Sequence, residues 1–141
     1  MIKYKKLPEN IEDLLPQAAA YLQSRNDISF AYLFGSFGRG VRFPLSDIDI
    51  AIYLKDPVGL QKAKLEIVGA LIDILKTDEI DLVVLNNAPL ALRMRILGSK
   101  KVIADRDPFF RHRYESLTMR QYFDFSVLEA EILNRRFLVG R

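Results

Sequence analysis

The stretch from Phe30 to Tyr53 reads Phe-Ala-Tyr-Leu-Phe-Gly-Ser-Phe-Gly-Arg-Gly-Val-Arg-Phe-Pro-Leu-Ser-Asp-Ile-Asp-Ile-Ala-Ile-Tyr. A largely apolar run, residues 28–34, ends at the pair Gly35-Ser36. Ten residues later a second, β-branched run begins at Asp47-Ile48-Asp49. This pattern predicts two strands joined by a loop that carries glycine and arginine.

The second run alternates carboxylate and apolar side chains. A strand places alternate residues on opposite faces, so Asp47 and Asp49 should share one face and the isoleucines the other. A third predicted strand, residues 79–85, carries Asp81 with the same parity, so it can project from that face if the two strands are neighbours. Carboxylates are ligands of magnesium, and two such ions about 3.5–4 Å apart serve many polymerases. Asp47, Asp49 and Asp81 are therefore predicted to be catalytic residues that bind Mg²⁺, with two ions expected.

The glycine-rich end of the hairpin is predicted to hold a triphosphate. Gly35 lets the backbone approach phosphate oxygens, and Ser36 offers a hydroxyl and an amide where a short helix over 35–40 should start. We expect Ser36 to cap that helix. Arg39 and Arg42 are close enough in sequence to pair with the β- and γ-phosphates, although surface loops commonly carry arginine without any such role.

Each of these features has a simpler explanation when it stands alone. A single Asp-X-Asp is usually the solvent face of a strand, and a single Gly-Ser is usually a turn. Here the two occur together, with a glycine- and arginine-bearing gap and a third aspartate of matching parity. The combination favours a catalytic site.

The rest of the chain predicts an α/β (α+β) fold, with a mixed sheet of about four strands flanked by helices. We expect a single domain over residues 1–141, in which 105–141 form a C-terminal helical extension. The further predicted elements are a helix over 10–25 interrupted at Pro16, a helix from Asp56-Pro57 to Lys76, a helix from Asn87 to Leu97 stopped by Gly98, a strand over 101–104, and a helical region from Asp107-Pro108 that breaks near 124–126.

Composition narrows the class of protein. The 141 residues include no cysteine, which excludes disulfides and thiolate zinc sites, and no apolar run approaches the ~20 residues of a membrane helix. We expect a cytoplasmic protein. Residues 93–141 carry eleven Lys and Arg against six Asp and Glu, so this half could face a polyanion or an acidic protein, or simply be a solvated helix. No nucleic-acid recognition motif appears.

The Gly-Ser pair, the ten-residue gap, Asp-X-Asp and Asp81 within Glu-Ile-Asp-Leu-Val-Val-Leu resemble the DNA polymerase beta nucleotidyltransferase superfamily. The short length, and a tail that runs on from Met119-Arg120-Gln121-Tyr122, resemble its minimal nucleotidyltransferases, the MNT or MntA-type antitoxins encoded beside HEPN-domain toxins.

This resemblance implies a nucleotidyltransferase fold, ATP and magnesium, and transfer of AMP to a hydroxyl. It implies that Asp47 and Asp49 are metal ligands, that Asp81 is a ligand or general base, and that Gly35 and Ser36 hold phosphate. The acceptor would be a tyrosine of a partner HEPN toxin, whose ribonuclease activity the modification silences.

Two other functions stay open. One is adenylylation of a small molecule such as an aminoglycoside, and the other is an antitoxin that neutralises its partner by binding alone, through the aromatic and basic C-terminal helix. In addition, Arg106, His112 and Tyr114 match the Arg-X4–6-His-X-Tyr pattern of HEPN toxins themselves. We interpret that match as chance, because a HEPN helical bundle is much longer than the segment after Ala104.

Overall fold

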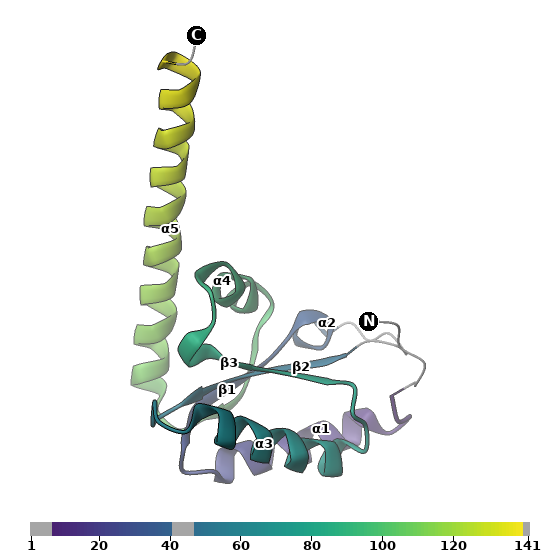
Figure 1. Cartoon of the computed structure of the whole chain (residues 1–141). Coiled ribbons are helices and arrows are strands. Elements are labelled where there is room, and N and C mark those ends of the chain that lie inside the picture. The colour runs from purple at the N-terminus through teal and green to yellow at the C-terminus, as the bar shows by residue number, and fades with distance from the viewer. Residues whose placement is uncertain (1–6, 41–46, 140–141) are drawn as a thin grey trace.

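The computed structural model describes residues 7–40 and 47–139. It consists of a four-stranded sheet with helices on both faces, and one long helix leaves the sheet at the C-terminal end (Figure 1). The elements in chain order are α1 (Ile11–Ser24), β1 (Ile28–Phe34), α2 (Gly35–Gly38), β2 (Ile48–Leu54), α3 (Leu60–Leu75), β3 (Ile80–Val84), the 3₁₀ turn η1 (Leu85–Asn87), α4 (Leu90–Ser99), β4 (Lys101–Asp105) and α5 (Pro108–Val139).

The strand order is β3-β2-β1-β4. β1 pairs antiparallel with both β2 and β4, whereas β2 and β3 run parallel. The predicted α/β fold with a mixed sheet of about four strands is therefore confirmed. The predicted neighbouring of the second and third strands is also confirmed, and it sets Asp49 directly beside Asp81 in the register.

The two faces of the sheet bury different sets of side chains. The face with Ile48, Ile50 and Ile52 packs against α1 and α3, as the alternation in β2 predicted. The opposite face buries Phe30 and Tyr32 of β1 against α4 and the start of α5. Asp49 belongs to this second face, so the candidate catalytic carboxylates lie on the side that α4 and α5 only partly cover (Figure 1).

The predicted interruption of the first helix at Pro16 is wrong, since α1 continues through the proline. Pro16 lies on the exposed side of the helix, so the backbone hydrogen bond that it removes is at the solvent face. Burial of one stripe on both sides of the proline outweighs that loss. The buried residues of this stripe are Ile11, Leu14, Ala18 and Leu22.

Two other helix ends differ from prediction by a few residues. Asp56 accepts a hydrogen bond from the Val58 amide at 2.9 Å, which makes a turn, and α3 starts only after Gly59, whose φ is +76°. In α4, Pro89 is the N-cap residue in place of Asn87, and the helix includes Gly98 before it ends at Ser99. Gly98 has room around it and a helical backbone, so it does not stop the helix.

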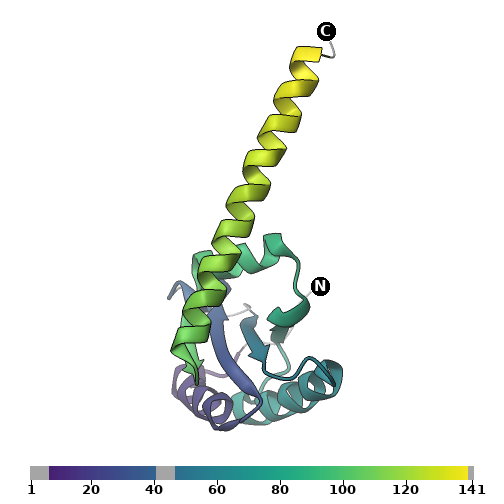
Figure 2. The same ribbon diagram turned by 90° about the vertical axis from the view of Figure 1, so that its left-hand side faces the viewer.

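The predicted break near residues 124–126 is also wrong, because α5 is one helix of 32 residues, about 48 Å long. Only its first turns contact the sheet and α4, and every residue from Met119 to Arg136 is exposed. Ser126 could cap a second helix only if the chain turned there, and no packing contact of the described residues makes it turn. Figure 2 shows the helix continuing well past α4.

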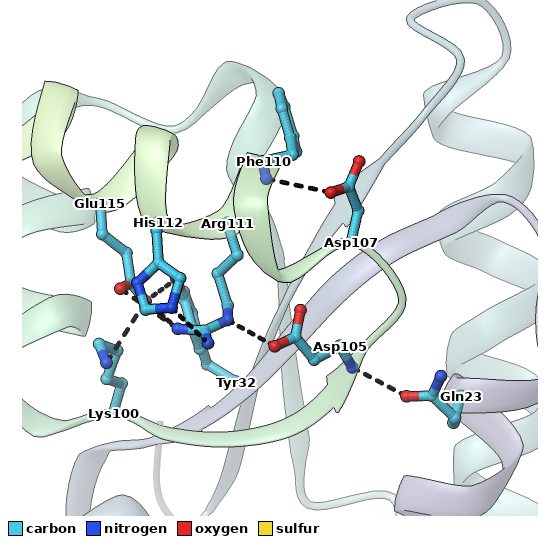
Figure 3. Close-up of polar contacts among 9 residues, drawn as sticks. All are labelled: Gln23, Tyr32, Lys100, Asp105, Asp107, Phe110, Arg111, His112 and Glu115. Atoms are coloured by element: carbon cyan, nitrogen blue, oxygen red, sulfur yellow. Dashed lines mark hydrogen bonds and ion pairs between the residues drawn. The ribbon is translucent and has the colours of Figure 1, made fainter.

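A cluster of charged and polar side chains ties the start of α5 to the sheet (Figure 3). The Tyr32 hydroxyl donates to Glu115 Oε2 at 2.6 Å, and Lys100 Nζ lies 3.3 Å from the same oxygen. Arg111 bridges two carboxylates, donating from Nη1 to Glu115 at 3.1 Å and from Nε to Asp105 at 2.9 Å. The cluster therefore fixes the direction in which α5 leaves the sheet.

The environment of Glu115 favours its charged form. Burial by itself would raise the pKa of this carboxyl, but the hydrogen bonds from Tyr32 and Arg111 and the charge of Lys100 outweigh burial and hold the pKa below its ordinary value. Burial raises the pKa of the Tyr32 hydroxyl, so this group keeps the proton that it donates. The ionised carboxylate and the neutral phenol thus stabilise each other.

Glu115→Gln should lower the free energy of unfolding at pH 7 by roughly 1.5–3 kcal/mol, because it weakens hydrogen bonds to a charged group. The pKa of Glu115 is lower in the folded state than its ordinary value of 4.5, so ionised Glu115 stabilises the fold fully at pH values above 4.5. This contribution to the free energy of unfolding is lost as the pH falls through the native pKa. The difference in free energy of unfolding between wild type and Glu115→Gln should therefore decrease at acid pH. Urea unfolding at several pH values measures it, with the exposed Glu129→Gln as the control. A gap that stays constant below pH 4.5 would contradict this assignment.

Candidate active site

The turn after β1 brings the two halves of the Gly-Ser and Asp-X-Asp pattern into contact. Phe34, the last residue of β1, is the register partner of Asp49 in β2. Gly35 follows with φ +66°, and a Cβ built on it would overlap the Asp49 carboxylate. Only glycine combines this backbone conformation with this contact. The phosphate-binding and metal-binding parts of the prediction therefore adjoin at one end of the hairpin.

The short helix α2 is held against the end of α4. A Cβ on Gly38 would lie 2.6 Å from the Leu33 carbonyl oxygen and would also overlap the carbonyl of Ser99. The Gly35 amide donates to the Ser99 hydroxyl at 3.2 Å. Ser99 thus positions the glycine turn, although the sequence analysis did not single it out. It lies 64 residues further along the chain, and its only local signal is its place after Gly98 at a helix end.

Ser36 is half-buried and lies inside α2. The predicted cap is wrong, because Phe34 is the N-cap residue and no side chain caps this helix. The reason is geometric: the chain enters α2 directly from an extended residue of β1, so Ser36 is already helical. It directly follows Gly35, the residue that adjoins the Asp49 carboxylate.

Two of the three predicted carboxylates, Asp49 and Asp81, share one side of two neighbouring strands. Asp49 and Asp81 are register partners on parallel strands, which are spaced about 4.8 Å apart. Asp47 precedes β2 by one residue with the parity of Asp49. Asp47 and Asp49 are half-buried and have interaction partners, whereas Asp81 is exposed. Within residues 7–40 and 47–139, no three His, Asp or Glu side chains are gathered closely enough to form a metal site.

Of the two arginines predicted to bind phosphate, Arg39 and Arg42, only Arg39 lies within the described residues. Arg39 follows α2, is exposed, and donates its backbone amide to the Gly35 carbonyl at 3.2 Å. Arg42 lies outside the described residues. The remaining match, to the HEPN pattern, does not form one cluster: Arg106 donates to the backbone of Gln23 in α1, His112 is exposed, and Tyr114 packs on Phe30 and Tyr53.

A mixed four-stranded sheet with helices on both faces defines an α/β protein (Figure 1). The family model described as polymerase beta, nucleotidyltransferase matches residues 17–109, more than half of the chain. The chain therefore belongs to the polymerase beta nucleotidyltransferase family, as the resemblance of its motifs predicted. The matched residues include β1, β2 and β3 with all three candidate aspartates.

Solved structures of similar fold come from toxin-antitoxin systems. A toxin-antitoxin structure with AMP-PNP shows a TM-score of 0.69 at 23% identity, covering 86% of this chain and 98% of that one. A tri-AMPylated Shewanella oneidensis HEPN toxin in complex with MNT antitoxin shows a TM-score of 0.65 at 22% identity, covering 89% and 98%. A mutant MntA-HpeT toxin-antitoxin structure shows a TM-score of 0.64 at 26% identity, covering 94% and 99%.

No curated protein matches this sequence. Among the helices of the described ranges, none has both the length and the apolar character needed to span a membrane.

Proposed function

We propose that this protein transfers AMP from ATP to a hydroxyl of a partner protein, and that it acts as the antitoxin of a HEPN-type toxin. The observation that carries the proposal is the contact between Gly35 and the Asp49 carboxylate, with Asp81 beside Asp49 in the register. This contact joins a backbone turn that can approach phosphate to a pair of carboxylates on one face of the sheet.

The chemistry of the donor set fits Mg²⁺, because hard divalent cations prefer carboxylate oxygens. Asp49 and Asp81 are register partners, and Asp47 precedes β2 by one residue. Asp47 and Asp49 would hold the ions, and Asp81 would be a further ligand or the general base. When bound, the metal would neutralise charge that develops on the phosphoryl oxygens and on the leaving group. Gly35 and Ser36 would supply backbone amides and a hydroxyl to the triphosphate, and the Arg39 and Arg42 guanidinium groups would neutralise its outer phosphates.

Asp81 is the residue best placed to receive the acceptor. It is exposed and lies at the edge strand β3, whereas Asp49 is half-buried one strand further in. In the proposed step the acceptor oxygen attacks the α-phosphorus of ATP, its proton passes to the Asp81 carboxylate, and pyrophosphate leaves. Because the proton must move as the bond to phosphorus forms, a base at this position promotes the step.

The partner would bind α5. From Leu117 to Leu133 this helix exposes large apolar side chains at almost every turn, and a single helix in water does not leave such a surface uncovered without a function. Three of the similar solved structures contain a toxin together with an antitoxin, and in one of them the toxin is AMPylated. We therefore place the partner on α5 and the acceptor, a tyrosine of that partner, at Asp81.

Two charges on α5 should weaken the partner complex by at least about tenfold, since each buries a carboxylate in an apolar interface. The variant is Phe123→Glu with Leu128→Glu, whose side chains are 66% and 54% exposed, so the fold itself should keep its melting temperature. Titration calorimetry with the purified partner measures the affinity. Leu65→Glu, 65% exposed on α3, is the matched control, and equal weakening by the control would contradict an α5 interface.

Radiolabelled ATP tests the proposed function directly. Incubation of this protein with Mg²⁺, labelled ATP and the protein encoded by the adjacent gene should label a tyrosine of that protein, which mass spectrometry identifies. Label that appears on an aminoglycoside and on no protein would favour the small-molecule function instead. Neutralisation of the toxin at a substoichiometric amount separates catalysis from binding alone, which needs one antitoxin for each toxin molecule.

A further inference from the structure

The free edge of β3 forms the floor of a groove. β3 is an outer strand of the sheet, with α3 on one side and α4 on the other (Figure 1). The groove has a volume of about 280 Å³ and contains Asp81. Leu60 and Lys64 of α3 line one wall, and Pro89 and Leu92 line the other. Small-molecule sites usually measure about 300–1,000 Å³, so this groove fits a few side chains better than a whole nucleotide.

The ladder fixes which backbone groups face the groove. Ile48 donates its amide to the Glu79 carbonyl at 3.0 Å and is the register partner of Ile80. In a strand, the N–H and C=O of one residue point to the same side, and those of the next residue point to the other. The backbone groups of Asp81 therefore face β2. Those of Ile80, Leu82 and Val84 face the free edge.

These outward groups are recessed. Leu82 and Val84 are only 4% and 7% exposed, and both line the groove between its two walls. Among the described residues, the hydrogen bonds outside the helices and strands do not use the backbone of Ile80 or Leu82. The carbonyl of Val84, the N-cap residue of η1, serves the first turn of that 3₁₀ helix instead. A polar backbone with this little access to water gains more from an added strand than an open edge would.

We infer that this groove binds an extended segment of the acceptor protein by strand addition, with the hydroxyl-bearing side chain of the segment placed at Asp81. The inference rests on the proposed transfer of AMP to a protein. Main-chain hydrogen bonds to Ile80 and Leu82 give affinity, as in other cases where a peptide extends a sheet. The acceptor must then be unfolded or extended around its hydroxyl, which a residue within a helix is not.

Side-chain parity links the groove to the chemistry. The residue of the added strand that lies opposite Asp81 points to the same face as Asp81 and Asp49. Its hydroxyl oxygen forms the new bond to the α-phosphorus, the bond from that phosphorus to pyrophosphate breaks, and the proton goes to Asp81. Leu60 and Leu92 fit apolar neighbours in the segment, and Lys64, which is half-buried, complements an acidic one.

Cross-linking tests the position of the acceptor. The chain has no cysteine, so Gln61→Cys, at an exposed residue that lines the groove, gives a single attachment point for a benzophenone maleimide. Irradiation with the purified partner should give a cross-linked partner peptide within five residues, the length of β3, of the residue that receives AMP. Gln17→Cys, exposed on α1, is the control and should give no such peptide. A cross-link at a distant segment, or an equal one from Gln17→Cys, would overturn the inference.

A second variant tests by kinetics whether the groove binds the acceptor. Gln61→Trp should fill part of the groove and raise the KM for the partner at least about tenfold by steric clash, while the Kd for ATP stays unchanged. AMP transfer with an unchanged KM would overturn the groove as the acceptor site. Absence of any label with the wild-type protein would instead contradict the proposed function, so the two failures are distinguishable.

Discussion

Asp49→Asn should reduce AMP transfer by at least about 10³-fold, equivalent to roughly 4 kcal/mol of transition-state stabilisation. The substitution keeps the size of the side chain and its contact with Gly35, but it removes the negative charge that a divalent cation requires. Because Asp49 is only half-buried, near the start of β2, the neutral amide should leave the fold intact. Single-turnover labelling of the partner at saturating ATP measures the loss.

The control for this result is Asp73→Asn, which removes a carboxylate from the exposed surface of α3. It should transfer AMP at the wild-type rate. Asp49→Asn should also bind the partner with unchanged affinity, since the substitution leaves the exposed apolar side chains of α5 unchanged. If the variant still neutralises the toxin at a substoichiometric amount, the metal-binding role of Asp49 is wrong.

Sequence periodicity was sufficient to predict the sheet. The apolar run 28–34 became β1 without a change of boundary, and the alternation after Asp47 became β2 with its isoleucines in the core. The parity of Asp81 was predicted for the same reason: a strand repeats every two residues, so one buried face determines the other. The alternation of apolar and polar side chains within one strand depends only on neighbouring residues, so it can be predicted from the sequence.

Contacts between distant parts of the chain were not predictable in this way. The hydrogen bond from Gly35 to Ser99 depends on how α4 packs beside β1, and no local pattern encodes it. The continuity of α1 through Pro16 depends on burial against the sheet, which overrides the local penalty of proline. For α5 the sequence predicted a break near residues 124–126, but the helix is continuous, because no contact of the described residues makes the chain turn there.

In the candidate site, too, features set by local sequence were predictable and contacts between separate elements were not. The sequence pattern was sufficient to predict that Asp49 and Asp81 share a face, and the chemistry of Gly35, Asp47, Asp49 and Asp81 stays a prediction. The register that sets Gly35 against Asp49 comes from the pairing of β1 with β2. The sequence placed phosphate binding at one end of the hairpin and metal binding at the other. The structure brings Gly35 and the Asp49 carboxylate to the same end, so any nucleotide held by the turn would lie beside that carboxylate.

That contact predicts a specific effect for Gly35→Ala. A left-handed backbone costs a residue with a Cβ about 1–2 kcal/mol, and here the added methyl group would also displace the Asp49 carboxylate. AMP transfer should fall roughly 10²-fold, since small displacements of a catalytic group are this costly. Urea unfolding and single-turnover labelling of the same preparation give the two effects separately.

Gly59→Ala separates strain from contact. Gly59 has φ +76°, close to the +66° of Gly35, but nothing lies within 4 Å of a Cβ at that position. It should therefore lose about the same 1–2 kcal/mol of stability from the backbone while keeping wild-type AMP transfer. If both alanine variants lose activity equally, general destabilisation explains the loss. If only Gly35→Ala loses it, the position of the Asp49 carboxylate limits the reaction, which ties the Gly-Ser turn to catalysis independently of any phosphate that the turn binds.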